Sequence, residues 1–415
     1  MKLYSAILAA AWLGLIGGCS NSAVAPCEGE ACVCPSVCPC DNGICQPDAD
    51  GDGISDADEG ADAQPPRDSD GDGTPDFQDS DADNDGLTDL VEGMTDWDGD
   101  GEPNAIDPHN DGAVPSLFFT SISTAFNQPI GIDYHAPTNS VVISVNYPTG
   151  TPLTFERITA DGAHTPFSSF SGLTDEVKIA TARTGSVFAA GTLFVGNGVD
   201  GQIARIAADG GSFETPWVTL PNGPNGLMRG ALYVDRTGVW NGDLLLVTST
   251  GTFWRVDAAG QPTWVADVGV HLEGLISVPN VPVRYGPLAG KAIAGAEGVG
   301  LLYVFAPDGT HTTLDFDVNI EDIDFVEPNE NFFGINYGTS KLLGAAATEL
   351  LPIAGDILLT TEFPEQGRSG LFWLRWNGAE LLSSELGMSP GSAAISQWEH
   401  MTTAPAGVVE IPPIS

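Results

Sequence analysis

From about Ser116 to the C-terminus, short apolar stretches alternate with polar ones and are separated by turn residues. Five of these stretches end in a glycine turn, and they cover residues 155–162, 203–210, 253–260, 302–309 and 372–378. The closing glycines at 162, 210, 260 and 309 follow one another at intervals of 48, 50 and 49 residues. Each stretch is typical of a strand that enters a hairpin turn.

Two further classes of apolar segment precede these hairpins. One class covers residues 141–145, 192–195, 243–247, 291–294, 332–335 and 356–360, and the other covers 129–134, 229–234, 272–278 and 320–326. Three or four short strands in each period of about 49 residues predict an all-β fold, a β-propeller. About 300 residues give six blades. Because the period breaks between Phe332 and Asp356, five or seven blades stay open.

Composition divides the chain into four parts. The 415 residues carry a net charge of −42, and residues 48–111 hold 23 acidic side chains against one base, Arg67. All seven cysteines lie between residues 19 and 45. We therefore expect a leader (1–18), a cysteine-rich stalk (19–47), an acidic segment (48–112) and the propeller (113–415). Such a charge argues against binding to nucleic acid, or to anionic lipid through basic patches.

The leader has one basic residue, Lys2, followed by an apolar run that is too short to span a membrane comfortably. It ends in Ile16-Gly17-Gly18-Cys19, which resembles the lipobox of bacterial lipoproteins. The resemblance implies export, lipidation of Cys19 and a place in the outer membrane or at the cell surface, with the lipid as the only contact with the membrane. The alternative is an ordinary signal peptide with an incidental cysteine.

Six cysteines follow Cys19. In an exported protein an even number indicates disulfides, here three with open connectivity. The alternative is a thiolate metal cluster. The residues concerned are Cys27, Cys32, Cys34, Cys38, Cys40 and Cys45.

Four acidic segments share one spacing, with acids at positions 1, 3 and 5, glycine at 6, Asp or Asn at 9 and an acid at 12. The expected ligands are Asp48, Asp50, Asp52, Asp56 and Glu59; Asp68, Asp70, Asp72, Asp76 and Asp79; Asp81, Asp83, Asp85, Asp89 and Glu92; and Asp96, Asp98, Asp100, Asn104 and Asp107. Ca²⁺ takes six to eight oxygens, and this spacing wraps them around one ion. The sequence therefore predicts several bound Ca²⁺ ions.

The second and third repeats are separated only by Ser80, which leaves no room for the flanking helices of an EF-hand. The segment resembles thrombospondin type 3 repeats, which wind around a string of Ca²⁺ ions. The fourth repeat differs from the other three, because Asn104 with Pro103 beside it stands at position 9, where the others have Asp. The alternative is a disordered acidic linker.

The last 300 residues resemble the six-bladed propellers of the gluconolactonase and senescence-marker-protein group, and more loosely NHL-type propellers. That resemblance implies a divalent ion, usually Ca²⁺, at the central tunnel. Three inner strands begin with an acid, Glu273, Glu321 or Glu399, and His400 follows the last of these. We expect the three acids to converge on one mouth of the axis as a site for a cation and catalysis. Alternatively they are exposed, or pair with Arg229 or Arg284.

These observations favour a lipid-anchored surface protein in which a calcium-stiffened spacer displays a propeller that recognises an extracellular protein, glycan or small molecule. A second hypothesis is a calcium-dependent hydrolase of the lactonase or esterase type. A third is an adhesion or scaffold protein. The fold by itself does not choose among these functions.

Overall fold

The computed structural model describes residues 40–41, 44–96, 101–109, 114–147, 152–229 and 231–412. The chain divides at about residue 108 into two compact units, here called the acidic unit and the propeller unit. The predicted leader, Cys19, Cys27, Cys32, Cys34 and Cys38 lie outside the described residues, as do the side chains of Cys40 and Cys45. None of the described helices is long and apolar enough to cross a membrane.

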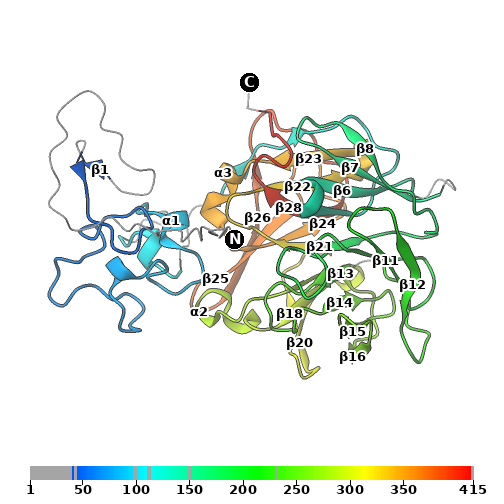
Figure 1. Cartoon of the computed structure of the whole chain (residues 1–415), viewed down its shortest axis with the longest axis horizontal. Coiled ribbons are helices and arrows are strands. Elements are labelled where there is room, and N and C mark those ends of the chain that lie inside the picture. Colours follow the sequence, from blue (N-terminus) through cyan, green and yellow to red (C-terminus); the bar gives the residue numbers. More distant parts are fainter. Residues whose placement is uncertain are drawn as a thin grey trace, which may run out of the picture. The chain divides into compact units, whose positions relative to one another are not determined.

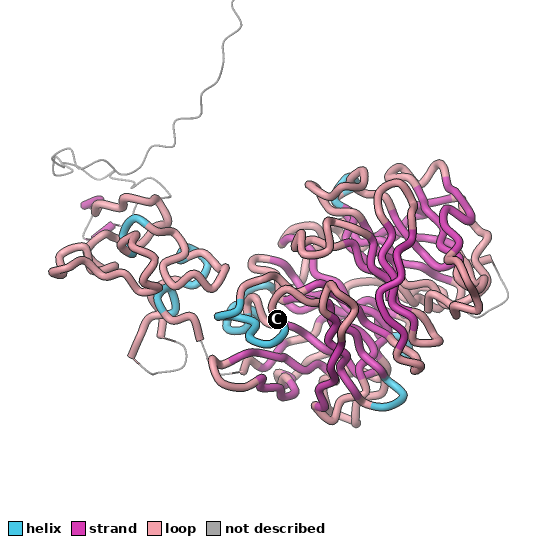
Figure 2. The backbone as a smooth tube through the Cα atoms, turned by 90° about the horizontal axis from the view of Figure 1, so that it is seen from below, coloured by secondary structure: helices cyan, strands magenta, loops and turns pink. Residues whose placement is uncertain are grey.

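The acidic unit consists mostly of turns and loops (Figure 2). Its regular elements are short: the strand pair β1 (Cys40–Asp41) and β2 (Ile44–Cys45), the 3-10 turns η1 (Asp76–Gln78) and η2 (Asn104–Ile106), and the helical turn α1 (Asp89–Glu92). Ile54, Ala82 and Ala105 are its buried apolar residues among those described. So small an apolar core indicates that other interactions must order this unit.

The propeller unit contains six four-stranded antiparallel sheets, so the six-bladed architecture is confirmed. In Figure 1 the first four blades follow one another along the colour scale from teal to yellow. In each of the first five blades the strands are given from the inner to the outer one. The first two blades are β5–β8 (Ile132–His135, Ser140–Val145, Thr154–Ile158, His164–Ser168) and β9–β12 (Ile179–Thr181, Leu193–Gly196, Gln202–Ile206, Phe213–Thr219). The next three are β13–β16 (Ala231–Val234, Leu244–Val247, Thr252–Val256, Pro262–Asp267), β17–β20 (Glu273–Ser277, Ala292–Ala296, Leu301–Phe305, His311–Asp315), and β21, β24, β25 and β26 (Ile320–Phe325, Ile357–Thr361, Leu371–Trp376, Leu381–Glu385).

The sixth blade is assembled from three distant parts of the chain. Its inner strand is the C-terminal β28 (Trp398–Pro405), followed by β22 (Glu330–Asn336), β23 (Lys341–Ala345) and the N-terminal β4 (Thr120–Ser121). The β22–β23 hairpin is inserted between the first two strands of the fifth blade. This insertion explains why the sequence period breaks between Phe332 and Asp356.

The inner strands contact one another in the closed order β5, β9, β13, β17, β21, β28. Their residues are buried on both faces, as expected for strands that lie between neighbouring blades around a central axis. The outer strands are more exposed, and in β16 Trp264 is 57% exposed. Apolar contacts join the blades, as between Phe253 and Phe305, whose ring centroids are 4.8 Å apart.

Candidate functional site

The acidic repeats fold into tight loops that their own carboxylates hold together. The glycine at position 6 has a positive φ in all four repeats, +97° at Gly53, +99° at Gly73, +93° at Gly86 and +106° at Gly101. Glycine adopts this conformation without steric cost. In the first loop, Asp48 Oδ1 accepts a hydrogen bond from the N–H of Gly51 at 2.7 Å. The second loop repeats this bond from Gly71 to Asp68 at 3.0 Å.

The acid at position 9 closes each of the first three loops. Asp56 accepts the N–H of Ala49 at 2.8 Å, Asp76 accepts that of Ser69 at 2.8 Å, and Asp89 accepts that of Ala82 at 3.0 Å. In each case Oδ1 makes this bond. Oδ2 of Asp76 also accepts the hydroxyl of Ser69, so the three acids are not equally available to an ion.

Acids from different repeats also come together. Carboxylate oxygens of Asp52, Glu59 and Asp89 lie within 4.8 Å of one another, although Asp89 belongs to the third repeat. Burial, and then the charges of neighbouring acids, raise the pKa of Glu59 to about 9 and that of Asp89 to about 8. Glu92 resembles Glu59: burial and then Asp83 are the main causes that raise its pKa to about 10.

These clusters fit a cation. Both carboxylate oxygens of Glu59 and of Glu92 are buried without a hydrogen-bond partner, and so is Oδ2 of Asp52. Unpartnered buried carboxylates are costly unless they are protonated or bind a cation. Oxygen ligands alone suit Ca²⁺. The loop at Asp68, Asp70 and Asp72 also gathers three carboxylates, but in a more exposed setting.

The fourth repeat is described in part, because residues 97–100 and with them Asp98 and Asp100 lie outside the described residues. Asp96 Oδ2 accepts the N–H of Gly101 at 3.1 Å, which matches the third loop, where Asp81 accepts Gly86. The Asn104 amide lies 3.4 Å from the carbonyl oxygen of Glu92 and donates to it. The residue in which the fourth repeat differs from the others therefore links it to the third.

The propeller unit has an acidic mouth at the end of the axis where the inner strands begin. Glu273 in β17, Glu321 in β21 and Glu399 in β28 are buried, with exposures of 5%, 4% and 6%. The electrostatic field of Glu273 and Glu399 acts on Glu321, which shows that the three carboxyl groups lie close together. The structure thus brings these acids together as expected and does not leave them exposed.

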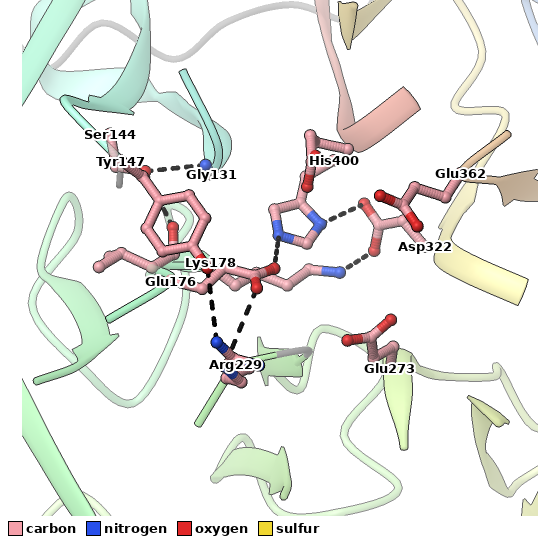
Figure 3. Close-up of polar contacts among 12 residues, drawn as sticks. Gly131, Ser144, Tyr147, Glu176, Lys178, Arg229, Glu273, Asp322, Glu362 and His400 are labelled. Atoms are coloured by element: carbon pink, nitrogen blue, oxygen red, sulfur yellow. Dashed lines mark hydrogen bonds and ion pairs between the residues drawn. The ribbon is translucent and has the colours of Figure 1, made fainter. Parts of the chain in front are cut away.

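Neither Arg229 nor Arg284 neutralises these three acids. Arg229 binds Asp175 through two nitrogens, with its Nη2 2.9 Å from Oδ1, and the Arg284 guanidinium donates to the carbonyl oxygen of Ala354. Figure 3 shows Arg229 on the side of the site that also carries Tyr147 and Glu176. Arg229 Nε lies 4.0 Å from Glu176 Oε2, and His271 Nε2 lies 3.2 Å from Glu273 Oε1. One guanidinium and one imidazole do not balance the carboxylates gathered at this mouth, which leaves room for a cation.

A fourth glutamate completes the acidic mouth. Glu176 precedes β9, and one of its carboxylate oxygens, a carboxylate oxygen of Glu321 and a ring nitrogen of His400 all lie within 4.8 Å of one another. In the first blade the corresponding position is Gly131. A side chain there would collide with the backbone, because a Cβ would lie 2.1 Å from the carbonyl oxygen of Val177.

His400 lies between two carboxylates without a hydrogen bond to either (Figure 3). Its Nε2 is 4.0 Å from Glu176 Oε1, and its Nδ1 is 3.9 Å from Asp322 Oδ2. Both ring nitrogens are buried without a hydrogen-bond partner. Burial, together with the nearby Lys178, lowers the pKa of His400 well below its usual range, so the ring is neutral and one nitrogen carries a free lone pair.

Lys178 and Asp322 form an ion pair beneath the acidic mouth. Asp322 also accepts the N–H of Met401 at 2.9 Å, which ties β21 to β28. Burial is the main cause that lowers the pKa of Lys178 to about 8. This pair supplies one positive charge, and Asp322 already neutralises it.

Desolvation and mutual repulsion act on the remaining acids. Burial, and then Glu273, raise the pKa of Glu176 to about 8, while burial, and then Glu176, raise that of Glu399 to about 9. Glu362 is joined to Glu399 through the amide of Gln397, at 2.9 and 3.0 Å. Several carboxylates beside an unpartnered imidazole fit a divalent cation with mixed oxygen and nitrogen ligands.

Sequence reasoning found three of the four glutamates and His400, but it missed Glu176, Lys178, Asp322 and Glu362. The period of about 49 residues could have been used to predict Glu176 as a site residue. It places an inner strand near residue 180, midway between the segments at 129–134 and 229–234, and Glu176 lies three residues before β9 begins at Ile179. Glu362 follows β24, which the inserted β22–β23 hairpin separates from the first strand of its blade. The sequence period does not reveal this insertion, so it could not predict that Glu362 lies near the site.

Comparisons with protein-family models and with curated protein sequences find no match. Solved structures do match the propeller. A putative gluconolactonase has a TM-score of 0.45 at 11% identity, covering 70% of this chain and 98% of its own. A gluconolactonase from Xanthomonas campestris has a TM-score of 0.41 at 12% identity, covering 68% and 87%. A catalytically inactive virginiamycin B lyase from Staphylococcus aureus, solved with quinupristin, has a TM-score of 0.40 at 12% identity, covering 67% and 90%. The likeness concerns the fold alone.

Proposed function

We propose that the propeller unit is a divalent-cation-dependent hydrolase for lactones or esters, with its site at the acidic mouth. The observation that supports this best is the convergence of Glu176, Glu321 and His400, whose ring nitrogens have no hydrogen-bond partner. The same arrangement would also hold a cation in a protein that binds a carbonyl compound without converting it, and activity assays separate the two cases.

Glu176, Glu321 and His400 are the proposed cation ligands, and Glu273 and Glu399 complete the negative field around them. A divalent cation held there would polarise the carbonyl oxygen of a substrate and stabilise the oxyanion that develops on it. The Lys178–Asp322 pair forms the base of the site and holds β28 in place through the N–H of Met401. Glu362, at the rim, is the candidate general base, because burial raises its pKa to about 7.

The acidic unit belongs to the same proposal as a calcium-ordered spacer. Its support is the set of unpartnered buried oxygens on Glu59 and Glu92. With export and lipidation at Cys19, the spacer would hold the propeller at the outer membrane or cell surface. Several Ca²⁺ ions in the spacer and one divalent ion in the propeller are the cofactors of this proposal.

A second candidate function is recognition of an extracellular protein, glycan or small molecule, as an adhesion or scaffold protein would perform. A hollow of about 480 Å³ favours it. Phe363, which is 66% exposed, lines this hollow together with Pro364, Arg368 and Phe372. An exposed aromatic ring beside a charged group is a common feature of binding surfaces.

The test is hydrolysis of a panel of lactones and carboxylic esters by the full chain, in buffer with Ca²⁺ and after chelation. We expect activity that depends on the cation and falls at least about a hundredfold in Glu321→Gln, since a lost ligand removes transition-state stabilisation of several kcal/mol. The matched control is Glu380→Gln on the exposed turn before β26. If no member of the panel is hydrolysed in any divalent cation, the hydrolase proposal is wrong and recognition takes its place.

A further inference from the structure

The sequence Arg-Thr-Gly occurs twice at equivalent places, at residues 183–185 and 236–238. Each copy follows an inner strand, β9 or β13. The glutamates of the acidic mouth precede or begin inner strands, so both arginines lie towards the other end of the axis. We call the group formed by Arg183, Arg236, Asp133, Asp324, Glu327 and Glu330 the arginine mouth.

Both arginines of this mouth are largely buried and stacked on tyrosines. The guanidinium of Arg183 lies 4.7 Å from the ring centre of Tyr134, and that of Arg236 lies 5.0 Å from that of Tyr233. Their side chains are only 17% and 21% exposed. Stacking and burial fix the two guanidinium groups in place at the end of the axis.

Most of the guanidinium N–H groups have no hydrogen-bond acceptor among the residues that the structure describes. Arg183 Nη2 donates to the carbonyl oxygen of Thr403 at 3.1 Å. Arg236 makes no hydrogen bond within the described part of the chain, and Nε of both arginines is buried without a partner. The ion pairs are long, with Nη2 of each arginine 3.9 Å from Asp133 Oδ1. Because a guanidinium carries five donors, this mouth leaves most of them for water or a ligand.

Acceptors are interleaved with these donors. Glu330 lies 3.6 Å from Arg183 through Oε1, and its Oε2 is buried without a partner. Asp324 and Glu327 also lie near Arg236, whose charge acts on both carboxyl groups. Asp133, in contrast, is already used, since it accepts the N–H groups of Tyr134 and Thr181 at 2.7 Å each.

This mixture of charges restricts the ligand. Four carboxyl groups surround two guanidinium groups, so an anion would meet net repulsion. A cation would be attracted to the acids, but it would offer no acceptor to the unpartnered guanidinium N–H groups. A neutral ligand whose groups both donate and accept can satisfy both kinds of partner. Hydroxyl groups have this property.

The space beneath the mouth restricts the ligand further. Asp133, Tyr233, Arg236 and Asp324 line a cavity of about 30 Å³ that continues to the Lys178–Asp322 pair. This volume accepts a water molecule or one hydroxyl group, but not a ring. A larger ligand must therefore lie across the opening with one hydroxyl directed inward.

We propose that the arginine mouth is a second binding site of the propeller, which takes neutral saccharides by hydrogen bonds from Arg183 and Arg236 and to Glu330 and Asp324. The site is independent of the cation at the acidic mouth. It adds a recognition function at the opposite end of the axis from the proposed hydrolytic one.

The test is isothermal titration of the full chain with D-glucose, D-galactose and D-mannose, each compared with its uronic acid and its 2-amino sugar. We expect at least one neutral sugar to bind saturably and more tightly than both of its charged counterparts. Arg236→Gln and Arg183→Gln should each weaken binding by about tenfold or more, as expected for hydrogen bonds with a charged partner.

Arg205→Gln is the matched control, because Arg205 also stacks on an aromatic ring, Trp217 at 4.9 Å, and pairs with Glu214, but on the outer strands of the second blade. It should bind the sugar as the original chain does. Asp324→Asn gives a second test if an arginine variant fails to fold. The proposal is overturned if no neutral sugar binds, if binding is insensitive to the folded variants, or if a uronic acid or amino sugar binds most tightly.

Discussion

At the residue scale, the two units use the same device, a buried carboxylate without a hydrogen-bond partner. Both carboxylate oxygens of Glu59 and Glu92 show it in the acidic unit. In the propeller unit Glu273 shows it at Oε2 alone, since its Oε1 lies 3.2 Å from His271 Nε2. Local spacing was enough to single out the first two as expected calcium ligands, because each repeat carries its own ligand pattern, and their role stays a prediction. The ring of acids in the propeller depends on contacts between blades, so only the acids at recognisable strand starts could be predicted.

Glu92→Gln tests the acidic unit at one residue. The substitution should lower the apparent affinity of this unit for Ca²⁺ by about tenfold or more, because Glu92 brings both carboxylate oxygens to a buried cluster. The control Asp62→Asn removes the same charge from an exposed position. Calcium titrations followed by circular dichroism compare the two, and equal affinities would contradict the assignment of Glu92 as a ligand.

The raised pKa values predict how stability depends on pH in the absence of divalent ions. Glu176 and Glu399 have folded-state pKa values of about 8 and about 9, above the value of about 4.5 expected after unfolding. The folded state therefore binds more protons, and stability should fall as the pH rises from about 5 to about 9. Thermal unfolding in EDTA measures this slope. Glu399→Gln should reduce it, and an unchanged slope would show that Glu399 titrates normally.

At the scale of elements, the interlocked fifth and sixth blades hold the ring closed. The segments predicted at residues 332–335 and 356–360 are indeed strands, β22 of the sixth blade and β24 of the fifth. Their assignment to different blades could not be predicted, because hairpins that pair within a blade and hairpins that are inserted between blades have the same alternating pattern. The β4 strand, at the other end of the unit's sequence, gives no local signal of its partner β23.

Trp398→Ala tests this closure. Trp398 is 1% exposed, donates its indole N–H to the carbonyl oxygen of Ser369 at 2.7 Å, and packs against Phe119 and Phe332. Its loss should lower the free energy of unfolding by about 3–5 kcal/mol. Trp264→Ala, at a site 57% exposed, should cost much less. Urea unfolding followed by circular dichroism compares them, and similar costs would contradict a closing role for β28.

At the scale of the whole molecule, the two units should respond differently to the removal of calcium. The propeller unit has six sheets with extensive apolar contacts between them, whereas the acidic unit has only a few buried apolar residues. Chelation should therefore open residues 48–107 to proteolysis while the propeller stays folded. Limited digestion with a protease specific for acidic residues, with and without Ca²⁺, shows this. Equal cleavage in both conditions would mean that calcium does not order the repeats.

The central claim is that the acidic mouth of the propeller holds a divalent cation. The most direct test measures the metal content per full chain after gel filtration in low calcium. It compares the original chain with its Glu176→Gln/Glu321→Gln double variant. Both retain the same repeats, so ions in the acidic unit cancel in the difference. The account predicts that the variant retains one divalent ion fewer per chain, and equal metal content in the two folded proteins would contradict it.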